Sequence, residues 1–207
     1  MLRREYAGEP FLEKHVSKNP IDQFMDWFED AGAKIKTDPN AMILATADPD
    51  GKPSSRTVLL KGYDENGFIF YTNYDSRKGK QILANPNVSL TFYWPELMRQ
   101  IHIEGVAEKV SEEQSDNYFS KRPSASQLSA LASSQSEVVE SREALEKQLK
   151  AMEKKFSGGK IPRPANWGGF CVKPNRIEFW QGRLNRLHDR ICYQQEDGQW
   201  EIVRLSP

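Results

Sequence analysis

Residues that favour β-strands fill two separated parts of this 207-residue chain, with a helix-forming stretch between them. β-Branched and aromatic residues, interrupted by turn dipeptides, dominate residues 41–110 and 167–205, whereas residues 111–156 lose this signal. Strands at both ends of the chain are expected to pair in one sheet, because unpaired sheet edges are avoided. The pattern predicts a mainly β, α+β fold: a mostly antiparallel barrel with peripheral helices.

The expected strands are joined by short polar turns, which favours antiparallel pairing. They cover residues 41–47, 53–63, 67–72, 88–94, 99–110, 167–173, 176–181, 189–194 and 200–205. Helices are expected over residues 20–32, 76–85, 111–121 and 141–156, the first capped by Asn19, the second capped by Ser76, and the last mostly solvated.

Size and composition narrow the class of protein. The 23.8 kDa chain fits one domain, residues 1–207, with an N-terminal arm over residues 1–19 and a mostly helical insertion over residues 111–160. Lys plus Arg equals Asp plus Glu at 29 each, so no general basic field is available for nucleic acid, and any anion site must be local. We expect no nucleic-acid partner.

Cysteine and histidine are too few for a disulfide-rich protein or for a metal-binding one. Cys171, Cys192 and three histidines provide neither a disulfide framework nor a cluster of metal ligands, so no metal is expected. The N-terminus is charged, and no stretch approaches the roughly 18 apolar residues of a membrane span. A soluble, unprocessed, cytoplasmic protein without a membrane partner is expected.

Cationic and aromatic side chains are concentrated in residues 180–190. If this run is extended, Arg186, His188 and Arg190 line one side, while Leu187 and Asp189 face the other. Such a row suits an anionic or planar ligand. A solvated edge strand explains the same residues, and the sequence favours neither interpretation.

Neither of the glycine-rich phosphate motifs, G-x-G-x-x-G and G-x-x-x-x-G-K-[ST], occurs, yet possible anion sites recur. The tripeptide Ser76-Arg77-Lys78 opens an expected helix, where free backbone N–H groups and the helix dipole favour an anion. The more common fate of such a tripeptide is a capped surface helix with solvated charges.

Two further groups of cations stand out. Arg56 and Lys61 lie in one apolar run, on opposite faces if the strand is regular, although a bulge would change this. A second group mixes hydroxyls with cations, and its alternative is an ordinary polar loop; its members are Tyr118, Lys121, Arg122, Ser124 and Ser126.

Read together, these clusters closely resemble the pyridoxine/pyridoxamine 5'-phosphate oxidase family along essentially the whole chain. The motifs are Arg-x-Val-Leu-Leu-Lys (56–61), Tyr-Thr-Asn (71–73), Ser-Arg-Lys (76–78), Arg-Gln (99–100), Gln-Ser (135–136), Trp-Gln-Gly (180–182) and Arg-Leu-His-Asp-Arg (186–190). The last two are the most specific. The resemblance implies a homodimer of split β-barrels that binds one FMN in each of two clefts between the subunits.

The resemblance also implies a role for each matched residue. Residues expected to bind FMN through its phosphate, its ribityl chain or the neighbouring strand are Arg56, Thr57, Val58, Leu59, Leu60, Lys61, Arg77, Lys78, Gln135 and Ser136. Those expected at the ring system or its approach are Tyr71, Thr72, Gln100, Trp180 and Arg190.

Substrate residues follow in the same way. Lys61, Tyr118, Arg122 and Ser126 are expected at the substrate phosphate; Arg186, Leu187 and His188 at its pyridine ring; and Arg3, Arg4, Glu5 and Tyr6 in an arm that covers it. Arg186 and His188 are the expected catalytic residues, and proton transfer by His188 is a hypothesis. Arg183 departs from the family pattern and adds a cation beside the site, which leaves its effect on substrate preference open.

The implied activity is oxidation of pyridoxine or pyridoxamine 5'-phosphate to pyridoxal 5'-phosphate, with hydride transfer to FMN and reoxidation by O₂ to H₂O₂. Two alternatives have the same kind of cleft. One is another split-barrel flavin oxidoreductase, against which Tyr118, Arg122 and Ser126 argue; fold alone does not fix the substrate. The other is a non-catalytic module that binds flavin or pyridoxal phosphate.

Overall fold

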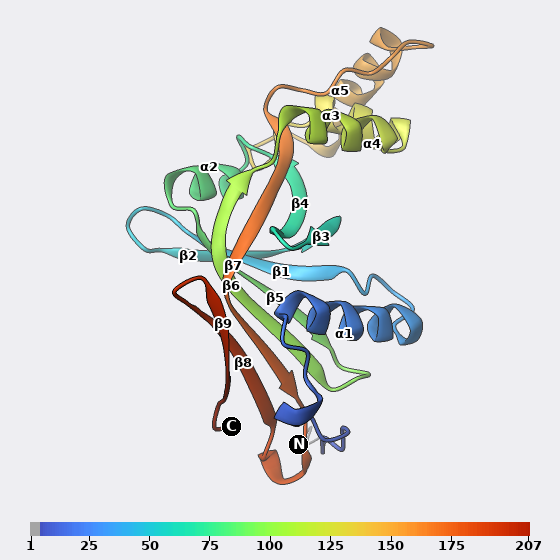
Figure 1. Cartoon of the computed structure of the whole chain (residues 1–207). Coiled ribbons are helices and arrows are strands. Elements are labelled where there is room, and N and C mark those ends of the chain that lie inside the picture. Colours follow the sequence, from blue (N-terminus) through green and yellow to red (C-terminus); the bar gives the residue numbers. More distant parts are fainter. Residues whose placement is uncertain (1–4) are drawn as a thin grey trace.

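The computed structural model describes residues 5–207, which form nine strands, five α-helices and two short 3-10 turns (Figure 1). The strands are β1 (Ala41–Ala47), β2 (Pro53–Leu59), β3 (Gly62–Asp64), β4 (Gly67–Asn73), β5 (Asn87–Trp94), β6 (Arg99–Lys109), β7 (Trp167–Gln181), β8 (Asp189–Glu196) and β9 (Gln199–Arg204). The helices are α1 (Pro20–Lys34), α2 (Arg77–Ala84), α3 (Glu112–Lys121), α4 (Ser124–Ala132) and α5 (Arg142–Lys155), and the 3-10 turns are η1 (Glu13–His15) and η2 (Leu184–Arg186).

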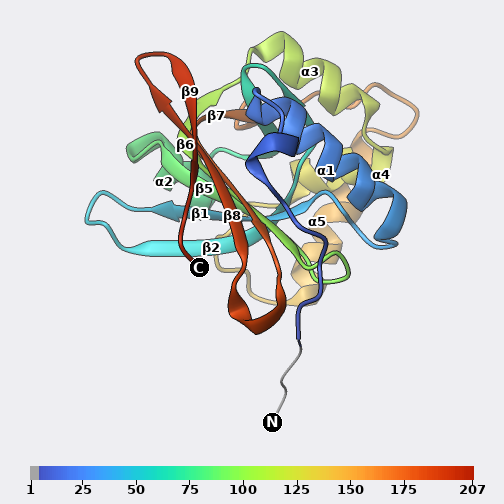
Figure 2. The same cartoon turned by 60° about the horizontal axis from the view of Figure 1, so that its bottom comes forward.

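All strand pairs of the described chain are antiparallel, in the order β2-β1-β5-β6-β7-β4-β3, with β8 and β9 attached through β7. The long strand β7 pairs with β4 over its first half and with β8 over its second half, so it joins the two ends of the molecule (Figures 1 and 2). Strands from both ends of the chain therefore share one curled sheet, as the sequence predicts.

A bulge bends β7 at its centre. The register with β6 shifts between Glu104 and Gly105, which leaves Asn175 without a partner in the ladder. Gly105 packs so closely against the backbone of Lys173 that a side chain there would collide with it. The bulge lets β7 change direction and accommodates Pro174, which has no N–H to donate to a ladder.

Helix α1 supplies much of the core. Asn19 caps it by accepting from the Ile21 N–H at 2.8 Å, and Pro20 occupies the first turn. Phe24 is fully buried, with its ring centroid 4.8 Å from that of Phe68 and 5.4 Å from that of Phe92. Burial of this aromatic face between the curled strands makes α1 and the sheet one packed unit.

The other helices lie on the periphery, as expected. Helix α2 packs against β1, α3 packs against β7, and α4 packs against α5, in which no residue is fully buried. Among the helices that the structure describes, none is both long enough and apolar enough to span a membrane.

Four sequence predictions of elements need correction. The run 53–63 is interrupted, because the N–H groups of Leu60 and Lys61 bond to Asn40 and Ile69 instead of continuing β2. The runs 167–173 and 176–181 are one bent strand, and residues 124–132, for which no helix was predicted, form α4. Residues 184–186 form η2, so Arg186 to Arg190 is not one extended strand.

Candidate functional site

Three cations gather where β2, β4 and the first turn of α2 meet. Ser76 caps α2 by accepting from the Gly79 N–H at 3.2 Å, and so places Arg77 and Lys78 in the first turn. The Lys78 ammonium donates to Thr72 Oγ1 at 3.3 Å and to Gln135 Oε1 at 3.2 Å. We call Arg56, Arg77 and Lys78, together with Thr72 and Gln135, the cationic cluster.

Arg56 reaches this cluster from the middle of β2. Its guanidinium donates to Thr46 Oγ1 and to Ser54 Oγ, both at 2.7 Å, and Gln81 Oε1 lies 3.4 Å away. All these partners are neutral oxygens, which orient the guanidinium without neutralising its charge. Nη1 also lies 3.4 Å from Leu44 O, so both terminal nitrogens face protein oxygens, and the Nε–H is the donor left without a partner in the described chain.

Electrostatics makes the cationic cluster a site for an anion. Within residues 5–207, no carboxylate lies within 4.0 Å of the charged nitrogens of Arg56, Arg77 or Lys78. Burial lowers the pKa of Lys78, and the charge of Arg56 lowers it further. Burial and the charge of Arg77 likewise lower the pKa of Arg56. A bound anion would relieve this repulsion.

A second cationic site is formed by Arg122, which lies in an aromatic cluster between α3 and the start of β7. The Tyr71 and Tyr118 rings stack with centroids 3.8 Å apart, and the Arg122 guanidinium lies 4.6 Å from the centroid of Trp167. Burial lowers the pKa of Arg122 and raises the pKa of Tyr118. Arg122 Nη1 is the buried side-chain polar atom of the described residues that has no hydrogen-bond partner. An acceptor such as a phosphate oxygen would satisfy it.

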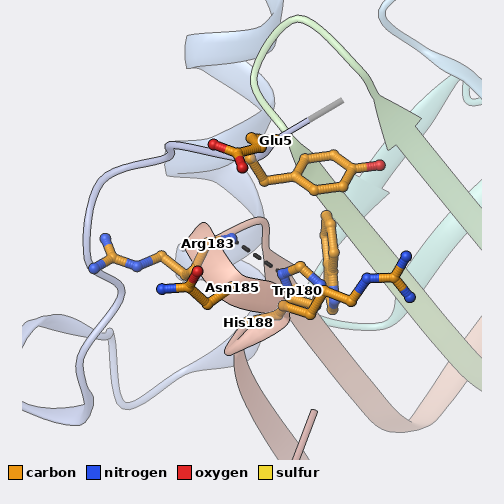
Figure 3. Close-up of a pocket in the computed structure, with 7 residues that line it drawn as sticks. Glu5, Trp180, Arg183, Asn185 and His188 are labelled. Atoms are coloured by element: carbon orange, nitrogen blue, oxygen red, sulfur yellow. Dashed lines mark hydrogen bonds between the residues drawn. The ribbon is translucent and has the colours of Figure 1, made fainter. Parts of the chain in front are cut away.

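A pocket of about 850 Å³ opens at the other end of β7, against the loop of residues 182–188 (Figure 3). Figure 3 shows Glu5 on one side of this pocket and Trp180 and His188 on the other. The Tyr6 ring meets Trp180 and His188 edge-on, with centroids 5.5 and 5.6 Å apart. The lining residues are Glu5, Tyr6, Trp180, Arg183, Asn185, Arg186 and His188.

The backbone of this loop sets the state of His188. Its Nδ1 accepts the backbone N–H of Arg183 at 3.0 Å, so the neutral ring carries its proton on Nε2. Burial lowers the pKa of His188, and the charge of Arg186 lowers it further. His188 is therefore a neutral N–H donor at neutral pH, beside a permanently charged guanidinium.

Residues 186–190 do not form the extended row that the sequence predicts, although Arg190 lies opposite Trp180 in the β7–β8 ladder. The turn at residues 184–186, where Asn185 and Arg186 have positive φ, breaks the alternation that would align Arg190 with Arg186 and His188. The Nε and Nη2 of Arg190 donate to the buried carboxylate of Glu178 at 2.7 and 3.0 Å, and its Nη1 donates to Ser206 O at 2.7 Å.

The remaining expected residues are spread over the surface and core. Thr57, Leu59 and Lys61 are exposed, whereas Leu60 is buried in the core and Val58 packs against it, so these last two could reach a ligand only through their backbone.

The other expected residues come from separate elements. Ser126 lies in the first turn of α4, exposed Ser136 lines a hollow of about 450 Å³ beside Arg77, and Leu187 is 71% exposed. Gln100 pairs with Trp180 across β6 and β7. Arg3 and Arg4 lie outside the described residues.

One chain does not bring all the expected FMN residues together. Thr72 pairs with Gly168 near the start of β7, whereas Trp180 lies near its end. Trp180 follows Gly168 by twelve positions, which is about 40 Å along β7 at the usual rise per residue, and the bulge at Asn175 lies between them. In Figure 1, β4 and α2, which carry part of the cationic cluster, lie above the middle of the molecule, whereas the loop between β7 and β8 lies at the bottom.

The sequence analysis missed several residues of these sites. Thr46, Ser54 and Gln81 orient Arg56, and Trp167 forms the aromatic wall beside Arg122. Glu178, the partner of Arg190, was also missed, although the sequence indicates it, because a carboxylate between Ile177 and Phe179 in a buried strand requires a cationic partner.

Comparison with known proteins agrees with this architecture. Residues 28–156 match the family model "Pyridoxamine 5'-phosphate oxidase", and residues 167–207 match "Pyridoxine 5'-phosphate oxidase C-terminal dimerisation region". The chain is 57% identical to the pyridoxine/pyridoxamine 5'-phosphate oxidase of Rubrobacter xylanophilus, covering 100% of this chain and 95% of that relative. It is 53% identical to the enzyme of the same name from Microcystis aeruginosa, covering 100% and 97%.

Solved structures show the same fold. PhzG from Burkholderia lata, in complex with tetrahydrophenazine-1-carboxylic acid, superposes with a TM-score of 0.91 at 30% identity and covers 97% of this chain and 100% of that one. A pyridoxamine 5'-phosphate oxidase-related, FMN-binding protein from Nostoc punctiforme gives a TM-score of 0.73 at 18% identity, covering 93% and 100%. These matches confirm the split-barrel fold, and the chain belongs to the pyridoxamine 5'-phosphate oxidase family.

Proposed function

We propose that this chain oxidises pyridoxine 5'-phosphate or pyridoxamine 5'-phosphate to pyridoxal 5'-phosphate, with FMN as cofactor and O₂ as the final electron acceptor. The observation that carries this proposal is the presence of two separate cationic sites without carboxylate partners in the described chain, at Lys78 and at Arg122. A phosphorylated cofactor and a phosphorylated substrate require two such sites. The names of the curated relatives support the same reaction.

The residues of the cationic cluster fit the phosphate end of FMN. Arg56, Arg77 and Lys78 would bind the phosphate, while the hydroxyl of Thr72 and the amide of Gln135 suit the ribityl chain. The chemistry that FMN supplies when bound is acceptance of a hydride from the C4' carbon of the substrate and transfer of two electrons to O₂, giving H₂O₂. The alcohol gives the aldehyde directly, whereas the amine gives an imine that water hydrolyses to the aldehyde and ammonia.

The protein's own contribution is position and charge. Arg122, Tyr118, Ser126 and Lys61 would bind the substrate phosphate, and Arg186 and His188 would hold its pyridine ring. His188 can donate through Nε2, and Arg186 can stabilise negative charge on the ring. Tyr6 and Trp180 form an apolar wall that would keep water from the reacting carbon.

A homodimer would bring these sites together. Because Thr72 pairs near the start of β7 and Trp180 lies near its end, about 40 Å further along the strand, a second copy would supply one of the two groups to each FMN. The match of residues 167–207 to a dimerisation region supports this assembly.

The direct test is to purify the protein and measure flavin absorbance, then to add pyridoxamine 5'-phosphate without oxygen. We expect yellow protein that bleaches on addition of substrate, regains its colour on exposure to air and releases H₂O₂. Yellow protein that never bleaches would favour a non-catalytic flavin-binding module, and colourless protein that does not take up FMN would contradict the proposal.

A second candidate function has one observation in its favour. PhzG, whose structure is bound to tetrahydrophenazine-1-carboxylic acid, shares 30% identity and a TM-score of 0.91 with this chain, so an enzyme of this fold can bind an aromatic carboxylic acid. Bleaching by a reduced phenazine carboxylate and not by pyridoxamine 5'-phosphate would favour that function. The unpartnered guanidinium nitrogen of Arg122 favours a phosphorylated substrate.

A further inference from the structure

The chain that precedes α1 forms an arm that lies along the loop between β7 and β8. The Gly8 N–H donates to Gly182 O at 3.1 Å, and the Phe11 N–H donates to Asp189 Oδ2 at 3.1 Å. A Cβ added to Gly182 would lie 2.7 Å from Tyr6 Cδ1, so glycine is required there for the arm to approach. These two hydrogen bonds hold the arm at Gly8 and at Phe11.

Arg183 binds this arm through its side chain. Its Nη1 donates to Gly8 O at 2.7 Å, and its Nε lies 3.5 Å from Asp189 Oδ2. Although Arg183 lines the pocket, its guanidinium extends away from His188 toward the arm (Figure 3). Arg183 is the additional cation whose effect on substrate preference could not be decided from the sequence.

Tyr6 lines the pocket together with its neighbour Glu5. Its ring meets both Trp180 and His188 edge-on, so it covers two of the residues expected to contact the ring systems. Tyr6 lies only two residues from Gly8, where the side chain of Arg183 is bound. The position of its ring therefore depends on whether Gly8 is held.

We propose that Arg183 is a positioning residue that binds the backbone of the N-terminal arm and thereby holds Tyr6 over the pocket formed with Trp180 and His188. Its backbone and its side chain act separately. The backbone N–H fixes the tautomer of His188, whereas the guanidinium holds the arm. The arm-holding role stands on these contacts alone; its effect on substrate rests on the proposed function.

Hydrogen exchange of the full-length protein, without any substrate, tests the arm-holding role. In Arg183→Ala the amides of Gly8 and Phe11 should exchange about tenfold faster, as expected for loss of one charge-assisted hydrogen bond. Arg183→Lys, which keeps one cationic donor, should recover part of the protection. Arg142→Ala is the matched control, because Arg142 is exposed and pairs only with Glu146 on α5. Unchanged exchange of residues 6–13 in Arg183→Ala would overturn the proposal.

Kinetics tests the consequence for substrate. Because the backbone donor to His188 remains in Arg183→Ala, KM for pyridoxamine 5'-phosphate should rise about tenfold while kcat changes less than about twofold. Tyr6→Ala should raise KM similarly, and the double variant should be no worse than either single variant, since both remove the same cover. Additive effects of the two substitutions would overturn a role of Arg183 through Tyr6. If wild-type protein turns over no pyridoxamine 5'-phosphate, the proposed function fails, and the exchange experiment still decides the arm-holding role.

Discussion

Two groups of buried and half-buried cations lie on the same sheet and differ in their surroundings. In the cationic cluster, the hydrogen-bond acceptors that residues 5–207 offer to Arg56 and Lys78 are neutral oxygens of side chains and backbone. At the β7–β8 ladder, Arg176 and Arg190 share the carboxylate of Glu178, which is 6% exposed. Burial alone would raise the pKa of Glu178, but the two arginines hold it below its usual value.

The difference distinguishes cations that stabilise the fold from cations that are available to a ligand. A buried charge is tolerated where an opposite charge and hydrogen bonds compensate it, and the Glu178 network meets both conditions. In the cationic cluster, the described residues provide hydrogen bonds but no opposite charge, so the positive charge remains available to an anion. Substitutions in the two groups should therefore have opposite consequences for stability and for FMN binding.

The largest effect is expected from Glu178→Ala. Removing the carboxylate leaves Arg190 without an ion pair in the described chain, whereas Arg176 keeps its pair with Glu104 at 2.8 Å. Loss of one partner of a buried ion pair costs about 3–5 kcal/mol of unfolding free energy, and the pair that Arg176 retains makes this the upper limit. Urea denaturation measures this loss. Glu108→Ala is the control, because Glu108 and Lys173 pair with both side chains more than half exposed and should contribute less than about 1 kcal/mol. Equal losses in the two variants would remove the distinction drawn between the two groups.

Next in size is the effect of Arg56→Met on the cofactor. We expect FMN affinity to fall about 100-fold, the loss of one or two charge-assisted hydrogen bonds. Stability should stay the same or rise, because burial and Arg77 already oppose the charge of Arg56. Fluorescence titration with FMN and urea denaturation give the two values, with Lys150→Met on α5 as control. A variant that lost stability and kept its FMN affinity would place Arg56 among the structural cations.

Arg186→Ala should separate substrate from cofactor. Arg186 lines the pocket and forms no ion pair within the described chain. We expect the rate of flavin reduction to fall at least about tenfold, while FMN retention changes by less than about twofold. Anaerobic stopped-flow absorbance measures the rate, and equilibrium dialysis measures retention. Equal loss of both would assign Arg186 to the cofactor.

The smallest expected effect concerns pH. Burial and the charge of Arg186 lower the folded-state pKa of His188, so the neutral donor persists below the usual histidine value of about 6.5. The rate of flavin reduction should be constant above that value and fall only as pH drops through the lowered pKa. The same group contributes stability that is present above the unfolded pKa and is lost as pH falls below it. If His188→Gln leaves both the rate and its pH profile unchanged, His188 does not transfer a proton.

Much of the fold follows from local signals in the sequence. The Asn19 cap with Pro20 places the start of α1, Ser76 places the start of α2, and the strand predicted at residues 41–47 coincides with β1. Asp197-Gly198, between the strands predicted at residues 189–194 and 200–205, is a dipeptide typical of tight hairpins, and both residues adopt the positive φ that such a turn requires. Each of these features depends on a few adjacent residues.

The incorrect predictions depend on tertiary contacts. The interruption at Leu60 and Lys61 depends on partners at Asn40 and Ile69, and the continuity of β7 past Pro174 depends on a bulge opposite Gly105. Arg186 adopts a positive φ although it is not a glycine, so no residue type in the sequence indicates the turn at residues 184–186. Sequence spacing identified the cations, but only the structure separates compensated cations from uncompensated ones.

The most direct test of the distinction between the two groups of cations is to compare the affinities of the apoprotein for FMN and for riboflavin, which differ only in the phosphate. We predict that FMN binds at least about 100-fold more tightly, because only FMN can compensate Arg56, Arg77 and Lys78, and that Lys78→Met removes most of this difference. Equal affinities for the two flavins in the wild-type protein would contradict the assignment of the cationic cluster to a phosphate.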